Sequence, residues 1–278
     1  MSEAIIIPAP IPIAPLFVPA HKPHLIEKAA KTSADAVFLD LEDAVAADEK
    51  QTARNALLTA SSTTPLWVRV NDVRSSYFED DMAYIKQCDF ATNKLRGLLL
   101  PKLEAPDDID LIFEKLGKIV PLLGFVETAK GLSQSDELLA HPHLLTVIFG
   151  NLDFALDCGA KPTRDALLFA RSRLIIAAKS ADKPAPLDGV TADFKDEALL
   201  LSDLEHAASL GFGGRLCIHP SQTEPTLKAF MPTQGEIDRA RAIIEAAGDR
   251  LVAQLNGQMI DRPVIEQARR TLKKAGLL

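Results

Sequence analysis

Eight short apolar runs alternate with longer amphipathic segments along the chain up to residue 220, and this alternation constrains the fold more than any other feature. The runs span residues 15–20, 36–42, 66–71, 97–102, 120–127, 144–150, 185–190 and 214–220. Near-continuous apolar runs are typical of strands in a parallel sheet that is covered on both faces. Intervening segments such as 48–61 and 164–181 have the spacing of amphipathic helices. The alternation predicts an α/β fold, specifically a (β/α)8 TIM barrel rather than an open doubly wound sheet.

The last part of the chain departs from this alternation. Residues 233–247 and 261–275 have the apolar spacing of two helices, and residues 248–260 join them. We therefore expect a catalytic barrel domain over residues 1–230 and a C-terminal helical extension or lid over residues 231–278. The chain of 278 residues is long enough for this arrangement, since a barrel of this class takes roughly 250 residues.

Composition narrows the class of partner and the compartment. The net charge of −7 argues against nucleic acid as the main partner. No stretch approaches the 18 continuous apolar residues of a membrane span, and residues 1–15 lack the basic region of a signal peptide. Cys88, Cys158 and Cys217 show no paired spacing, which predicts a reducing, cytoplasmic location.

Ionisable side chains stand where the predicted strands end. In chain order they are Asp40, Glu42, Arg69, Lys102, Glu127, Asp188 and His219, and Asp153 follows the sixth run by a few residues. Because barrel active sites are built at the carboxyl ends of the strands, we expect these groups to face a shared polar site. Asp40, Glu42 and Asp43 lie so close in sequence that they repel one another unless cations or hydrogen bonds lie between them.

Glu127 and Asp153 are candidate ligands of a magnesium ion. Mg2+ is usually held by one or two carboxylates, with waters and substrate oxygens completing an octahedron. The sequence contains no His/Cys cluster of the kind that indicates zinc. The alternative is that each acid caps the helix that follows it, and spacing alone does not separate these two interpretations.

Arg69 closes the third predicted strand and offers a bidentate fork for a carboxylate. The alternative is an internal ion pair with Asp40 or Glu42, which is compatible with a functional role. Structural ion pairing is an equally good interpretation of Lys102 and Asp188.

His219 follows the eighth run, in the stretch "CIHPSQ". We expect this histidine to order the last loop of the barrel rather than to transfer protons.

The sequence resembles the citrate lyase β-subunit and malyl-CoA lyase family of carbon–carbon lyases from about Pro15 to the C-terminus. The matching stretches are "LFVPA", "ADAVFLDLEDAV", "VRVN", "LLPKLEAPDDI", "GFVETAKGL", "FGNLDFALDCGA", "LGFGGRLCIHPSQ" and "MIDRPVIEQARRTL". The resemblance implies a (β/α)8 barrel that holds Mg2+ on Glu127 and Asp153, with Arg69 on the substrate's carboxylate or carbonyl oxygen. It also implies that Asp261 is the acid–base group of a neighbouring subunit's site, in a homo-oligomer that is a trimer or a hexamer.

Two departures from the family pattern bear on the substrate. The family usually has Arg-Ser before "LFVP", whereas Ile13, Ala14 and Pro15 stand there, which predicts the loss of a cationic contact to the acyl-CoA or the substrate. Leu152 replaces a polar or acidic residue in the metal loop. His24 and Lys22 are candidates for contacts to the phosphates of CoA, and the alternative is that they are solvated residues at a helix start.

The leading hypothesis is a Mg2+-dependent lyase that cleaves a citramalyl-, malyl- or citryl-type 3-hydroxyacyl-CoA to acetyl-CoA and a 2-oxo acid. Such a reaction needs a polarised oxygen, a stabilised enolate and an acid–base group, for which Mg2+, Arg69 and Asp261 are the candidates. One alternative is a thioesterase or a pyruvate-type aldolase on the same metal site. Another is a subunit of a citrate lyase complex that acts with an acyl carrier protein.

Overall fold

The first compact unit of the molecule is built on one parallel sheet of eight strands. The computed structural model describes residues 10–90, 95–248, 253–255 and 258–278, and the chain divides into two units after Leu227. The strands are β1 (Leu16–Pro19), β2 (Val37–Asp40), β3 (Leu66–Arg69), β4 (Leu95–Leu100), β5 (Leu122–Val126), β6 (Thr146–Phe149), β7 (Leu187–Asp188) and β8 (Gly214–Arg215). They are neighbours in sequence order. The predicted parallel α/β fold is confirmed.

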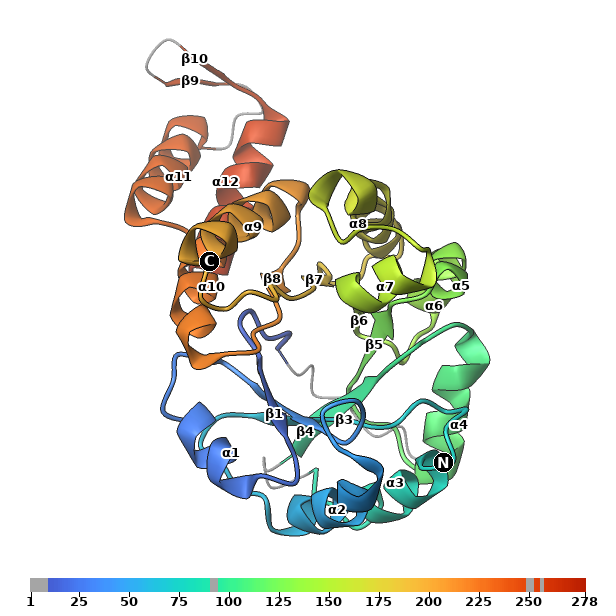
Figure 1. Cartoon of the computed structure of the whole chain (residues 1–278). Coiled ribbons are helices and arrows are strands. Elements are labelled where there is room, and N and C mark those ends of the chain that lie inside the picture. The colour runs from blue at the N-terminus through green and yellow to red at the C-terminus, as the bar shows by residue number, and fades with distance from the viewer. Residues whose placement is uncertain (1–9, 91–94, 249–252, 256–257) are drawn as a thin grey trace. The chain divides into compact units, whose positions relative to one another are not determined.

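Helices follow the strands and lie outside the sheet, as Figure 1 shows. They are α1 (Pro23–Ala29), α2 (Lys50–Thr59), α3 (Phe78–Ile85), α4 (Pro106–Leu116), α5 (Ala129–Ser133), α6 (Ser135–Ala140), α7 (Asn151–Asp157), α8 (Arg164–Ser180), α9 (Glu197–Leu210) and α10 (Thr223–Phe230), with short 3-10 helices η1 (Ala47–Glu49) and η2 (Pro220–Gln222). Within the described ranges, no helix has the length and apolar composition needed to cross a membrane.

The sheet is apolar on both faces, which explains why its strands appear as continuous apolar runs. Alternate residues of neighbouring strands pack together in one core cluster, and Phe38 of β2 stands in register with Trp67 of β3. The cluster comprises Ala36, Phe38, Trp67, Leu99, Leu123, Phe125, Ile148, Leu187 and Leu216.

Backbone hydrogen bonds join β1 and the residues before it to β8 and the residues after it. The N–H of Phe17 donates to the carbonyl of Cys217 over 2.9 Å, and the N–H of Cys217 donates to the carbonyl of Pro15 over 2.9 Å. The N–H of Arg215 donates to the carbonyl of Ile13 over 2.8 Å. The first and last strands of the series are therefore held side by side.

A buried ion pair network ties β7 and β8 to α8. Asp188 is fully buried and accepts a hydrogen bond of 2.9 Å from Nε of Arg171. Its second oxygen pairs with Nη1 of Arg215, which is also buried. The structural ion pairing that the sequence analysis offered for Asp188 is therefore present.

The second unit contains two helices and a short hairpin. The helices α11 (Gln234–Ala247) and α12 (Arg262–Lys274) match the prediction, whereas the antiparallel strands β9 (Ala253–Leu255) and β10 (Gln258–Ile260) were not expected. The apolar face of α12 packs against α11 in a core of Ala240, Ile243, Ala247, Ile260, Ile265, Ala268 and Leu272. This unit therefore covers the apolar face of α12 by itself.

Candidate active site

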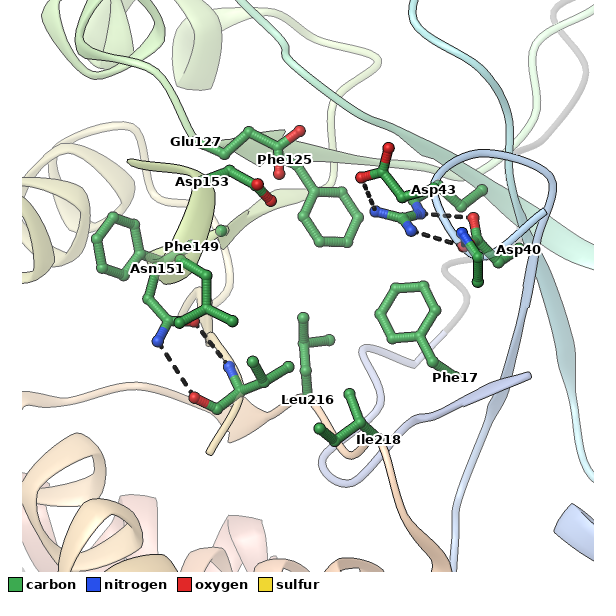
Figure 2. A pocket seen from close by; sticks show the side chains of 15 residues that line it. Phe17, Asp40, Asp43, Phe125, Glu127, Phe149, Asn151, Asp153, Leu216 and Ile218 are labelled. Atoms are coloured by element: carbon green, nitrogen blue, oxygen red, sulfur yellow. Dashed lines mark hydrogen bonds and ion pairs between the residues drawn. The ribbon is translucent and has the colours of Figure 1, made fainter. Parts of the chain in front are cut away.

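A cavity of about 380 Å³ lies at the carboxyl ends of the strands. The predicted residues Arg69, Glu127 and Asp153 all line it, together with the acids Asp40 and Asp43. Figure 2 shows the carboxylates of Glu127 and Asp153 next to each other on one side of this cavity. The structure therefore brings together, in one cavity at the carboxyl ends of the strands, groups that are far apart in the sequence.

Arg69, at the end of β3, is held by the acids that follow β2. Its Nε and Nη2 donate to the two carboxylate oxygens of Asp40 over 2.7 and 2.6 Å, and its Nη1 lies 3.0 Å from Oε2 of Glu42. The structure therefore contains the internal ion pair that was the alternative role of Arg69. Asp40 occupies the bidentate fork that the sequence suggested for a substrate, so a ligand would meet the remaining N–H groups of the guanidinium.

Burial and charge act in opposite directions on these carboxyl groups. Burial alone would raise the pKa of Asp40, but the charge and hydrogen bonds of Arg69 hold that pKa below its usual value. Burial raises the pKa of Glu42, and the charges of Arg69 and Lys102 oppose the rise only in part. Arg69 itself has a raised pKa, since the attraction of Asp40 and Glu42 outweighs its burial, so it stays cationic.

Two aromatic rings also fix the position of Arg69. Its guanidinium carbon lies 5.0 Å from the ring centroid of Phe17 and 5.7 Å from that of Phe125. Cations are attracted to ring faces at such distances. We did not single out these phenylalanines from the sequence, where they appear only as apolar members of two strands.

Glu127 is buried at the end of β5, and its surroundings favour its neutral form. Burial raises its pKa to about 8, and the charges of Glu42 and Asp153 add to this effect, while Arg69 opposes it. Its Oε1 accepts a hydrogen bond of 2.8 Å from the backbone N–H of Lys102. A Cβ at Gly150 would lie 2.5 Å from Oε2, so glycine leaves the space that this oxygen fills.

The pair of Glu127 and Asp153 fits a hard divalent cation. A buried carboxylate next to a second one is electrostatically unfavourable, and a cation between them removes that penalty. In the part of the chain that the structure describes, no group of three or more His, Cys, Asp or Glu side chains is arranged to hold a metal. Two carboxylates completed by waters and substrate oxygens match Mg2+ rather than zinc.

Neither acid caps a helix. The hydroxyl of Thr128 caps α5, and Gly150 holds the N-cap position of α7. Asp153 lies in the first turn of α7 without a cap hydrogen bond. Beside it, Leu152 lines the cavity and is 39% exposed.

Two residues near the cavity have structural roles, of which that of Asn151 was not expected from the sequence. Lys102 has a left-handed backbone with φ of 46°, and its Nζ lies 2.7 Å from Oε1 of Glu42, which confirms the ion pairing expected for it. The buried amide of Asn151 accepts from the N–H of Val190 and donates to its carbonyl, over 2.9 and 3.1 Å. This pair of bonds fixes the loop after β6 to the loop after β7.

The remaining predicted residues lie around this site or in the second unit. Lys22 and His24, at the start of α1, are exposed and do not line the cavity. Asp261 is the N-cap of α12 and accepts a hydrogen bond from the N–H of Val264.

His219 orders the loop after β8, as expected. Its ring stacks on Phe194 with centroids 4.5 Å apart, and its Nδ1 accepts a hydrogen bond from the N–H of Ser221.

The residues that replace the family's Arg-Ser lie away from the cavity. The N–H groups of Ile13 and Ala14 donate to the carboxylate of Asp35 over 2.6 and 2.9 Å. Asp35 stands just before β2, at the amino ends of the strands, and none of the three residues lines the cavity. The side chains at these positions therefore contribute nothing to the lining of the cavity.

A parallel sheet with an acid pair and an arginine at the carboxyl ends of its strands has the arrangement in which enzymes of the parallel α/β class build their active sites. A family model described as HpcH/HpaI aldolase/citrate lyase matches residues 14–220. The chain belongs to the HpcH/HpaI aldolase/citrate lyase family.

Relatives with assigned names span nearly the whole chain. A (3S)-malyl-CoA thioesterase of Cereibacter sphaeroides is 35% identical, over 94% of this chain and 93% of its own. The mitochondrial citramalyl-CoA lyase of Homo sapiens is 32% identical, over 94% of this chain and 84% of its own. Among solved structures, the protein CitE from Mycobacterium tuberculosis, in complex with magnesium, acetoacetate and coenzyme A, superposes with a TM-score of 0.81 at 30% identity, covering 95% of this chain and 98% of that one.

Proposed function

We propose that this protein is a Mg2+-dependent carbon–carbon lyase that cleaves a short 3-hydroxyacyl-CoA of the citramalyl, malyl or citryl type. Its products are acetyl-CoA and a 2-oxo acid. The observation that carries the proposal is that Glu127 and Asp153 line one cavity with Arg69. Membership of the aldolase/citrate lyase family and the magnesium and coenzyme A of the Mycobacterium tuberculosis relative support it.

The cleavage breaks the bond between the α carbon of the thioester and the carbon that bears the hydroxyl group. The hydroxyl proton leaves as its oxygen becomes the carbonyl of the 2-oxo acid. The electron pair of the broken bond stays on the α carbon as an enolate, which takes up a proton to give acetyl-CoA. Bound between Glu127 and Asp153, Mg2+ would polarise the substrate oxygen as a Lewis acid.

The residues of this chain supply position and charge for that reaction. Arg69, locked on Asp40 and between two phenylalanine rings, points a fixed positive charge at the cavity. Fixed donors of this kind stabilise negative charge that develops on oxygen. For the proton transfer we propose Asp261 of a neighbouring subunit, in a trimer or a hexamer. Capping of α12 by Asp261 is compatible with this role.

The same proposal includes finer features of the fold and of CoA binding. A closed (β/α)8 barrel is supported by the hydrogen bond from the N–H of Phe17, in β1, to the carbonyl of Cys217, which follows β8. Lys22 and His24, exposed after β1, would meet the phosphates of CoA. A cytoplasmic location stays a prediction.

A thioesterase is the second candidate function, because one relative with 35% identity is named a (3S)-malyl-CoA thioesterase. In a thioesterase, a metal ion at the same site would polarise the carbonyl oxygen of the thioester, and water would attack the carbonyl carbon. It would release free CoA and leave the hydroxy acid intact.

The test is a product screen with purified protein and Mg2+ on citramalyl-, malyl- and citryl-CoA. A lyase releases 2-oxo acid and acetyl-CoA in equal amounts without free thiol. A thioesterase releases free thiol without 2-oxo acid. Omission of Mg2+ with added EDTA is the control, and cleavage of none of the three thioesters would contradict both functions.

A further inference from the structure

The loop of residues 41–44 that follows β2, here called the acidic loop, lies against a buried ammonium group. Lys50, the first residue of α2, is 7% exposed and does not line the active-site cavity. Its Nζ donates to the backbone carbonyls of Leu41 and Glu42 over 2.5 and 2.8 Å, and to Oδ1 of Asn71 over 2.8 Å. Because an ammonium group has three donors, every N–H of this side chain is in use. The role of Lys50 therefore lies in the groups that it holds.

A fully buried carboxylate fixes Asn71, the side-chain partner of Lys50. The backbone N–H and Nδ2 of Asn71 both donate to Oδ2 of Asp81, over 2.8 and 2.7 Å. The other oxygen of Asp81 accepts a hydrogen bond of 2.7 Å from Nε of Arg54, which is also buried. Arg54 belongs to α2 and Asp81 to α3, and these helices lie next to each other outside the sheet (Figure 1). The ammonium group is therefore held in place by two helices.

The carboxylate of Asp40 joins the acidic loop to Arg69. Its Oδ1 accepts hydrogen bonds from the N–H of Glu42 over 2.9 Å and from Nε of Arg69 over 2.7 Å. Its Oδ2 accepts from the N–H of Ala44 over 2.9 Å and from Nη2 of Arg69 over 2.6 Å. Each oxygen of Asp40 thus binds the backbone of the loop and the guanidinium together. The position of the acidic loop therefore determines where Arg69 is held.

We propose that Lys50 is a positioning residue of the active site, which holds the acidic loop where Asp40 can fix Arg69. The inference rests on the proposed function for its effect on turnover, because Arg69 has to keep a fixed orientation to stabilise charge on a substrate oxygen. The anchorage of Arg69 is a property of the metal-free chain and can be measured without turnover.

Two effects would loosen the acidic loop if the ammonium group were absent. The carbonyls of Leu41 and Glu42 would each keep one neutral donor at 3.1 Å, from Asn71 and Val45 respectively, and lose the charged donor, which makes the stronger hydrogen bond. The acids of the stretch 40–43 would also lose a nearby positive charge and would repel one another more strongly.

The first experiment follows Arg69 by nuclear magnetic resonance in the whole protein, in EDTA and without substrate. Its Nε–H signal in a nitrogen-15 correlation spectrum is identified by its absence in Arg69→Lys, and the exchange of this proton with water is measured. In Lys50→Met we expect exchange to be about tenfold faster than in the wild type. Exchange within about twofold of the wild type would overturn the proposal. Absence of cleavage in the product screen would leave this measurement valid.

Lys183→Met is the matched control. Nζ of Lys183 also donates to two backbone carbonyls, those of His141 and Leu144, over 2.9 and 2.6 Å. These residues precede β6 and do not line the cavity. We expect this variant to lower the melting temperature and to leave the exchange of the Nε–H of Arg69 unchanged. Equal acceleration in both variants would indicate a general loosening of the fold and would overturn the proposal.

Two further substitutions of Lys50 complete the test. Lys50 lines a second hollow of about 460 Å³, so a larger side chain has room there. Lys50→Arg keeps the charge and the donors, and we expect exchange to be clearly slower than in Lys50→Met; equal exchange in the two would overturn the proposal. If Lys50→Met does not fold, Lys50→Gln takes its place, since glutamine keeps a donor for a carbonyl and lacks the charge. Exchange in Lys50→Gln as slow as in the wild type would overturn the proposal.

Discussion

The backbone N–H of Lys102 donates a hydrogen bond of 2.8 Å to Oε1 of Glu127, while the side chain of the same residue pairs with Glu42. Lys102 makes both contacts from a left-handed backbone with φ of 46°. Such conformations are uncommon for residues other than glycine and cluster at functional sites. One strained residue after β4 thus orients the predicted metal ligand and the acid that contacts Arg69.

Removal of the ammonium group of Lys102 is predicted to separate these two contacts. Lys102→Met keeps the N–H that binds Glu127 and loses the charge on Glu42. We expect the affinity for Mn2+, used as a paramagnetic substitute for Mg2+, to stay within about threefold of wild type. The free energy of unfolding should fall by about 1 kcal/mol, a small loss because the lysine is partly exposed. Mn2+ titration by electron paramagnetic resonance and urea unfolding measure the two. A large loss of Mn2+ affinity would show that the ammonium, not the N–H, positions Glu127.

Glu127→Gln is predicted to abolish Mg2+-dependent turnover and to stabilise the metal-free fold. The amide keeps an oxygen for the N–H of Lys102 and removes a buried carboxylate that lies near Glu42 and Asp153. In EDTA at pH 8 we expect the melting temperature to rise by about 2–4 °C. Asp153→Asn, at an exposed position, should lose turnover with little change in melting temperature. Full activity of wild type in EDTA would contradict the metal assignment.

Asp40→Asn is predicted to lose stability in a pH-dependent manner. The pKa of Asp40 in the folded protein lies below its value of 3.8 in the absence of interactions, because Arg69 stabilises the carboxylate. The contribution of the pair is therefore complete above about pH 4 and is lost as the pH falls through the folded-state pKa. Urea unfolding should give a deficit of about 3 kcal/mol that is constant from pH 5 to 7 and narrows below pH 4. A deficit that widens as the pH falls would contradict this account.

Arg69→Lys keeps the charge but cannot hold both oxygens of Asp40 and contact Glu42 as well. By analogy with removal of one oxyanion donor, we expect kcat to fall by roughly 10²–10³. Circular dichroism and the melting temperature verify that the variant is folded. Kinetics close to those of the wild type would show that Arg69 acts only as a structural ion-pair partner of Asp40.

The strands were predictable because they are buried on both faces, but some boundaries were not. The run 214–220 has its apolar side chains at Leu216, Cys217 and Ile218, yet β8 contains only Gly214–Arg215. Leu216 and Ile218 are apolar for another reason, since they line the cavity. Between α11 and α12, strands of three residues are too short for an alternating pattern to be visible.

The acids and the arginine of the site could be predicted because strand ends collect functional side chains in this fold. The hydrogen-bond and ion-pair partners of these residues could not be predicted. The pair of Arg69 and Asp40, and the bond from Lys102 to Glu127, join residues 29 and 25 positions apart. Such contacts depend on the register of neighbouring strands, and a local sequence pattern carries no information on which donor meets which acceptor.

The role proposed for Asp261 predicts complementation between inactive variants. Asp261→Asn and Glu127→Gln should each be nearly inactive, and asparagine preserves the cap of α12 because it is as good an N-cap as aspartate. If Asp261 serves a neighbour's site, subunit exchange creates some sites with both wild-type residues. In an equal random mixture of a cyclic oligomer, about a quarter of the sites are complete, so about a quarter of wild-type activity should return.

A second mixture is the matched control for this prediction. Glu127→Gln and Asp153→Asn both alter the acid pair of one chain, so no exchange of subunits can assemble an intact pair from them. We expect no activity from that mixture, with exchange verified by native mass spectrometry in both cases. If subunits exchange and the Asp261→Asn mixture also stays inactive, then Asp261 does not act across a subunit boundary, and its cap on α12 is sufficient to explain its presence.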